Sequence, residues 1–84
     1  MQLLRFTAKW CGPCKVLGAE FEKVNINIPI KVIDIDDDEE GYAKRYGVMA
    51  LPTTIYVNED GEELARFIGL RNCNQIALFI TGVE

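Results

Sequence analysis

Short apolar runs rich in β-branched residues recur along the chain and predict four β-strands, over residues 3–7, 30–35, 53–57 and 63–68. Between the first two strands, apolar residues with helical spacing predict a helix from residue 13 to about residue 24. A last helix is predicted because its apolar residues fall at i, i+3, i+4 and i+7 on one face. These residues are Ile76, Phe79, Ile80 and Val83. That face is expected to pack on the sheet.

Another helix is predicted between the second and third strands. It opens at the acidic stretch 36–40, runs to Tyr46 and stops at Gly47, because carboxylates suit the first turn of a helix and glycine commonly follows its last turn. The element order is therefore β-α-β-α-β-β-α, which defines an α/β fold class. The first two strands should pair in parallel through the helical crossover. A hairpin turn at Asp60-Gly61 should make the last two strands antiparallel.

The size and charge of the chain narrow the possible functions. Its 84 residues suit one domain over residues 1–84 and leave no room for a second core. The longest apolar runs fall far short of the roughly 20 residues needed to span a membrane. A net charge of −4 without clusters of Lys and Arg argues against nucleic-acid binding. Because the amino end lacks a signal-peptide pattern, the cytoplasm is the expected location.

The cysteines carry the candidate chemistry. Cys11 and Cys14 form a Cys-x-x-Cys pair where a predicted strand meets a helix, and this pattern is typical of thiol redox sites. Cys73 is left unpaired and is expected to be a spectator thiol. No metal site is expected, because zinc needs about four ligands and the chain has no His and one Cys outside the pair. The acidic stretch lacks the Gly and distant Glu of a calcium loop.

The position of the pair at a helix start assigns different roles to its two thiols. With Cys11 at the cap, its thiolate would face the unpaired amides of the first turn and the positive end of the helix dipole. Pro13 suits that first turn because it loses no helical hydrogen bond there. Cys14 would be the third helical residue, further from solvent. Cys11 should therefore attack and Cys14 should resolve, although a static disulfide would leave the same pattern.

Five stretches of this sequence, taken together, resemble the thioredoxin family. They are Trp10-Cys11-Gly12-Pro13-Cys14-Lys15, then residues 43–48, 51–53, 58–61 and 67–69, in the family's order along nearly the whole chain. The resemblance implies a four-stranded mixed sheet with helices on both faces. One departure from the family's usual pattern lies at the amino end, because thioredoxins usually carry an extra strand and helix before the first active-site strand. The chain thus resembles a minimal thioredoxin.

The resemblance also implies a function. The Gly12-Pro13 dipeptide is similar to that of the reducing members, so the implied activity is thiol–disulfide exchange that reduces disulfide-containing protein substrates, with no separate cofactor. The implied partners are those substrates and an upstream reductase, most simply thioredoxin reductase, and the implied state is a monomer. Two alternatives stay open: a glutaredoxin-like enzyme that uses glutathione, and a thioredoxin-fold binding subunit without catalysis.

The implied substrate-binding residues surround the pair: Trp10, Gly12, Pro13, Leu51, Pro52 and Gly69. In the family, the proline at the position of Pro52 has a cis peptide bond and leaves the backbone of the preceding residue, here Leu51, free to pair with an extended substrate segment. A proline that merely opens an edge strand is the alternative. Residues 47–50 are expected to complete an apolar rim.

One position departs from the family within the site. Thioredoxins usually carry a buried Asp six residues before the first active-site cysteine, and this chain has Arg5 there. A buried cation is costly unless it is paired, so Arg5 is expected to meet a carboxylate, with Asp34 on the adjacent strand as the first candidate. Arg5 is also a candidate for tuning the pKa of Cys14, since a nearby cation favours thiolate over thiol.

Overall fold

The computed structural model describes residues 1–83. Its elements are β1 (Gln2–Thr7), α1 (Gly12–Glu22), β2 (Ile30–Asp34), the 3₁₀ helix η1 (Ile35–Asp37), α2 (Tyr42–Arg45), β3 (Thr53–Val57), β4 (Glu63–Ile68) and α3 (Cys73–Val83). The four predicted strands are confirmed, as are the first and last helices, although α1 ends at Glu22 instead of continuing to residue 24. Within residues 1–83, no helix is long and apolar enough to cross a membrane.

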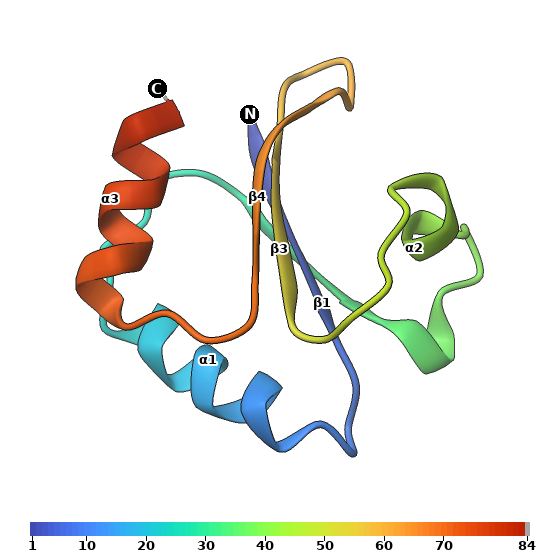
Figure 1. Ribbon diagram of the computed structural model, residues 1–84. Coiled ribbons are helices and arrows are strands. Elements are labelled where there is room, and N and C mark those ends of the chain that lie inside the picture. Colours follow the sequence, from blue (N-terminus) through green and yellow to red (C-terminus); the bar gives the residue numbers. More distant parts are fainter. Residues whose placement is uncertain (84) are drawn as a thin grey trace.

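The strands form one mixed sheet in the order β2-β1-β3-β4. As predicted, β1 and β2 are parallel and β3 and β4 are antiparallel, while β1 also pairs with β3 in the antiparallel sense. Figure 1 shows α1 and α3 on one side of the sheet and α2 on the other. The expected sheet with helices on both faces is therefore confirmed, and β1, which leads directly into the Cys-x-x-Cys pair, is a central strand.

Alternating side chains of the sheet build a core on each face, as strand geometry requires. Towards α1 and α3, one cluster gathers the buried residues Leu3, Leu17, Phe21, Tyr56, Phe67 and Ile76, with Phe79, Ile80 and Val83 packed against it. The predicted apolar face of α3 thus does pack on the sheet. Towards α2, the other cluster gathers Leu4, Phe6, Ile33, Ile55 and Val57. Neighbouring residues of β1 therefore anchor both cores.

The prediction of one helix from the acidic stretch to Tyr46 was wrong. The chain instead forms η1, leaves helical geometry, and starts α2 only at Tyr42. Gly41 adopts a left-handed φ of 71°, which interrupts any continuous helix. The carboxylate of Asp38 accepts hydrogen bonds from the N–H groups of Tyr42 and Ala43 at 3.0 and 2.9 Å, so this side chain caps the short helix.

The expected pairing of Arg5 with Asp34 was also wrong. In the parallel register Arg5 lies opposite Val32, while Asp34 lies opposite Thr7 and its carboxylate accepts a hydrogen bond from the N–H of Asp36. The guanidinium of Arg5 instead stacks over the ring of Phe21, with 4.6 Å from Cζ to the ring centroid. Strand register and the length of the side chain carry this cation towards α1, where an aromatic face takes the place of the expected carboxylate.

Gly18 lies in the middle of α1, at the point where Arg5 meets the helix. A Cβ at this position would lie 3.2 Å from Nη2 of Arg5, which is the flexible end of a long side chain. We expect Gly18→Ala to stabilise the protein by roughly 0.5–1 kcal/mol, because alanine is the better helix former and the guanidinium need move only a few tenths of an ångström. Urea unfolding measures the change. A loss of stability would mean that the guanidinium is held rigidly in place.

Candidate functional site

Cys11 and Cys14 form a disulfide where β1 leads into α1, with their Cα atoms 5.3 Å apart. Cys11 is the N-cap residue of α1, as predicted, and its Sγ accepts a hydrogen bond from the N–H of Cys14 at 3.2 Å. Both cysteines are buried, with 5% and 2% of their surfaces exposed. The pair is therefore held by the first turn of a helix that starts beyond the carboxyl end of a central strand.

The start of α1 favours negative charge on Cys11. The first amides of a helix lack partners within it, and one of them, the N–H of Cys14, already points at the Cys11 sulfur. The helix dipole adds a partial positive charge at the same end. Pro13 lies in the first turn, where its missing N–H costs no helical hydrogen bond. A negative charge on the Cys11 sulfur would therefore lie beside this N–H group and the positive end of the helix dipole.

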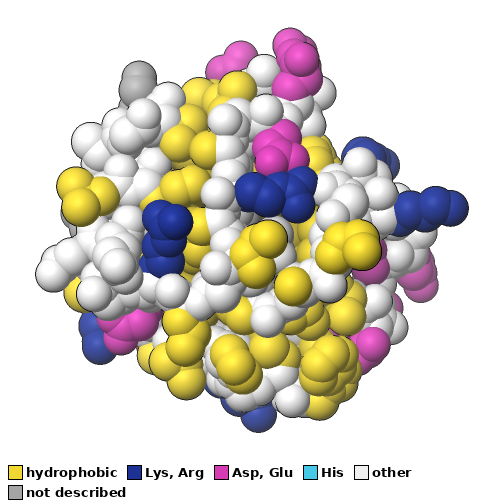
Figure 2. All heavy atoms as spheres, in the orientation of Figure 1, with side chains coloured by type: hydrophobic (Ala, Val, Ile, Leu, Met, Phe, Trp, Pro, Cys, Tyr) yellow, Lys and Arg dark blue, Asp and Glu magenta, His cyan; other side chains and the backbone are white. Residues whose placement is uncertain are grey.

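An apolar groove of about 500 Å³ opens beside the disulfide. Its lining consists of Trp10, Cys11, Gly12, Pro13, Ile35, Ala43, Val48, Met49, Ala50 and Leu51. Figure 2 shows hydrophobic side chains gathered at the lower edge of the view, where β1 leads into α1 in Figure 1. Met49 and Trp10 are 94% and 68% exposed, which is unusual for large apolar side chains. Of the two cysteines, only Cys11 lines the groove.

The structure brings most of the predicted site residues together. Trp10, Gly12, Pro13 and Leu51 line the groove with Cys11, whereas Pro52 and Gly69 lie outside its lining. The Leu51–Pro52 peptide bond is cis, as the resemblance implied. Pro52 is buried, and its carbonyl oxygen accepts a hydrogen bond from the N–H of Gly69 at 2.9 Å. These last two residues are thus neighbours that lie outside the lining of the groove.

Two residues of the groove were not predicted as part of the site. Ile35 comes from η1 and Ala43 from α2, and both also pack against the buried cluster on that face of the sheet. They reach the groove only because the chain after β2 folds back towards the loop before β3. Their one signal in the sequence is position: Ile35 follows the carboxyl end of a parallel strand, where open α/β sheets commonly bind ligands.

A hydrogen bond that the sequence did not predict fixes Trp10 at the rim of the groove. The indole Nε1–H donates to Oδ2 of Asp36 at 2.8 Å, which joins the loop before α1 to η1. Because most of the indole is exposed, we expect this bond to be an important restraint on the ring. Asp36 therefore acts from the edge of the site by orienting an apolar wall of the groove.

Replacing Asp36 with alanine should free the Trp10 ring and leave the fold intact. The chain has one Trp, so its fluorescence reports on this side chain alone. We expect lower fluorescence anisotropy and a stability loss below about 1.5 kcal/mol, the usual range for one hydrogen bond. Asp37→Ala, a neighbouring carboxylate in η1 without this bond, is the matched control. Equal anisotropy in the two variants would show that Asp36 does not restrain the ring.

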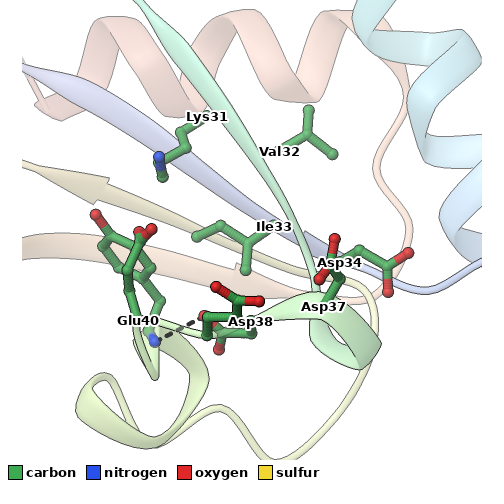
Figure 3. A pocket seen from close by; sticks show the side chains of 9 residues that line it. Lys31, Val32, Ile33, Asp34, Asp37, Asp38 and Glu40 are labelled. Atoms are coloured by element: carbon green, nitrogen blue, oxygen red, sulfur yellow. Dashed lines mark hydrogen bonds between the residues drawn. The ribbon is translucent and has the colours of Figure 1, made fainter.

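A second hollow, of about 390 Å³, lies between β2 and the acidic stretch. Figure 3 shows the carboxylates of Asp34, Asp37, Asp38 and Glu40 around it, with Lys31 on β2 as their cationic neighbour. The disulfide does not line it. Across residues 1–83, no group of three or more His, Cys, Asp or Glu side chains is arranged to hold a metal ion. The disulfide groove is therefore the stronger candidate site.

Comparisons with known proteins agree with this geometry. The family model for thioredoxin matches residues 1–82. The mitochondrial thioredoxin of Bos taurus is 38% identical over 79 residues, which cover 89% of this chain and 46% of the relative, so the chain spans about half of that relative's length. The prophage-derived thioredoxin-like protein YosR of Bacillus subtilis is 35% identical over 71 residues, covering 84% of this chain and 85% of the relative.

A solved structure extends the likeness to three dimensions. A mutant thioredoxin of Halobacterium salinarum superposes with a TM-score of 0.84 at 30% identity, covering 98% of this chain and 73% of that one. The family match over nearly the whole sequence, the shared fold and the cysteine pair at the start of α1 lead to one conclusion. This chain belongs to the thioredoxin family.

Proposed function

We propose that this protein is a thiol–disulfide oxidoreductase that reduces disulfide bonds in other proteins. The observation that carries the proposal is the Cys11–Cys14 disulfide at the start of α1, with Cys11 at the wall of an apolar groove. A static structural disulfide has no need of an adjacent open groove. A redox pair does need such an opening, because a sulfur atom of the substrate disulfide must reach one of the pair's two sulfur atoms.

The reaction runs in two exchanges. In the reduced protein, the Cys11 thiolate attacks a substrate disulfide, which forms a mixed disulfide and releases one substrate sulfur as a thiolate that takes up a proton. Cys14, as a thiolate, then attacks the Cys11 sulfur. This step forms the Cys11–Cys14 bond, breaks the mixed disulfide and releases the second substrate sulfur as a thiolate, which takes up a proton from solvent. Two electrons pass from the dithiol to the substrate, and no separate cofactor takes part.

The groove supports a docking mode for the substrate. Trp10, Pro13 and the exposed Met49 offer apolar contacts around the reacting sulfur. Leu51 also lines the groove, and because β3 begins only at Thr53, its backbone lies outside that strand. We propose that an extended substrate segment pairs with the Leu51 backbone, as in strand addition. Gly12, Pro52 and Gly69 then shape the floor and back of the docking region.

The electron donor that supports turnover distinguishes this proposal from a glutaredoxin-like enzyme. We expect turnover of a model protein disulfide when NADPH is supplied with thioredoxin reductase, measured as NADPH oxidation. Turnover only with glutathione and glutathione reductase would instead support a glutaredoxin-like enzyme. Turnover with neither, together with partner binding that survives replacement of both Cys11 and Cys14 by serine, would support a binding subunit.

We further propose that the protein works as a single domain and as a monomer. The two cores share β1 and β3 and are built on one sheet over the described residues, which supports one folding unit. The cytoplasmic location expected from the sequence stays a prediction, and mitochondrial thioredoxins are among the relatives. Size-exclusion chromatography with light scattering would test the monomer.

A further inference from the structure

Arg5 places a cation beneath the redox site, between the central strand and α1. It lies on β1 opposite Thr54 of β3 and Val32 of β2. Its guanidinium stacks on Phe21 and approaches Gly18 so closely that a Cβ there would lie 3.2 Å from Nη2. The side chain is thus held against the inner face of α1, the helix that also carries both cysteines.

The charge of Arg5 forms no ion pair in the described part of the chain. The ion pairs found there involve other residues, and the Nε of Arg5 is buried without a hydrogen bond. The facing hydroxyl of Thr54 is also buried without a hydrogen bond. Burial lowers the pKa of Arg5, and Glu22 at the end of α1 opposes that shift. An arginine stays protonated under these conditions, so a weakly compensated positive charge persists.

The Nη2 end of Arg5 meets α1 at Gly18, about one helical turn beyond Cys14. Gly18 follows Cys14 by four residues on α1, so both lie on the same helix face, about 6 Å apart along the axis. Cys14 is 2% exposed and lies among Ala8, Ile35 and Leu51, which carry no charge. The low polarity of these surroundings makes the field of a nearby cation stronger than it would be in water.

The elements next to Arg5 carry other titratable groups. They include Glu20 and Glu22 on α1, Asp34 on β2 and Cys73 at the start of α3. Glu20 is engaged elsewhere, because its carboxylate accepts hydrogen bonds from Lys23 and from the N–H of Cys73. Asp34 accepts a hydrogen bond from the N–H of Asp36. Glu22 is the carboxylate whose charge acts on Arg5, and no ion pair joins it to the guanidinium among residues 1–83.

We propose that Arg5 stabilises the Cys14 thiolate from which the resolving attack starts. This inference rests on the proposed function. Arg5 does not touch the substrate and is a positioning residue, which acts through its field on the Cys14 sulfur. The Cys14 thiol gives its proton to solvent, and its thiolate then attacks the Cys11 sulfur, forming the disulfide and expelling the substrate thiolate. The resolving step therefore needs no carboxylate base.

A thiolate titration tests the proposal without any substrate. Cys11→Ser and Cys73→Ser together leave Cys14 as the single thiol, and ultraviolet absorbance follows its ionisation. In this background, Arg5→Met should move the titration to higher pH, because a neutral side chain of similar bulk replaces the cation. Arg5→Lys should restore most of the shift, since it keeps the charge. A purely structural role for Arg5 would not separate the Met and Lys variants in this way.

The proposal is overturned if the Cys11→Ser, Cys73→Ser protein gives the same titration curve with and without Arg5→Met. If Arg5→Met does not fold by circular dichroism, Arg5→Gln supplies a second neutral variant for the same comparison. In the protein that keeps Cys11 and Cys14, Arg5→Met should slow release of the substrate from the mixed disulfide by only about threefold, even if the Cys14 thiolate falls tenfold. The reason is that a more basic thiolate is also a better nucleophile. The titration uses no substrate or reductase, so its result does not depend on whether the proposed function holds.

Discussion

Replacing Cys14 with serine should leave the protein joined to its substrate through Cys11, with turnover reduced on the order of a thousandfold. The structure gives the reason, because Cys11 lines the groove and caps α1 while Cys14 lies behind it, 2% exposed. Without Cys14, the mixed disulfide formed by the first exchange has no internal thiol to resolve it. Non-reducing gel electrophoresis and mass spectrometry of the adduct measure this outcome.

The matched control removes the other thiol of the pair. Cys11→Ser should lose turnover to the same extent but should form no adduct, because neither of the remaining thiols, Cys14 and Cys73, lines the groove. Cys73→Ser should keep full activity, since Cys73 lies at the start of α3 and outside the groove. An adduct formed by Cys11→Ser and not by Cys14→Ser would reverse the assigned roles.

Phe6→Ala should cost about 3–5 kcal/mol of stability, a large share of the roughly 4–13 kcal/mol expected for a domain of this size. Phe6 is 1% exposed, and its cluster includes the partly buried residues Ile35, Val48 and Leu51, which also line the groove. The loss combines the removed apolar surface with the cavity left behind. Urea unfolding followed by circular dichroism gives the free energy of unfolding.

Leu78 on α3 is the control for this measurement. It is 72% exposed, so Leu78→Ala should change stability by no more than about 0.5 kcal/mol. If Phe6→Ala cost no more than this control, the packing described between β1 and the groove would be incorrect.

The sequence predicts well the parts of this fold that depend on local pattern. The four strands, α1 and α3 follow from apolar spacing, and the cap at Cys11 follows from a Cys-x-x-Cys pair with Pro13 placed where a strand meets a helix. Each of these features is decided by residues close together in the chain. The most chemically informative part of the site could therefore be predicted before the structure was known.

Features that depend on the geometry of a few side chains could not be predicted in the same way. The acidic stretch suits a helix start by composition, but the carboxylate of Asp38 caps a later and shorter helix, and Gly41 breaks the path between them. The pattern of charges does not reveal which carboxylate will cap. Local propensity and side-chain capping competed here, and capping decided the structure.

Contacts between segments that are distant in the chain also could not be predicted from the sequence. Arg5 was expected to seek the opposite charge of Asp34, yet strand register separates them and Phe21 receives the guanidinium. The bond from Trp10 to Asp36 joins residues 26 positions apart, and no spacing rule indicates such a bond. These contacts depend on the paths of long side chains, which become defined only once the sheet and α1 are packed.

A single-turnover exchange tests most directly the central claim that the Cys11–Cys14 pair passes electrons to protein disulfides. The fully reduced protein would be mixed with an equal amount of a protein that carries one accessible disulfide, and both products would be alkylated and weighed by mass spectrometry. The mechanism predicts that two substrate thiols are formed for each Cys11–Cys14 disulfide, with Cys73 still reduced. A reduced pair that persists beside an unreduced substrate would contradict the claim.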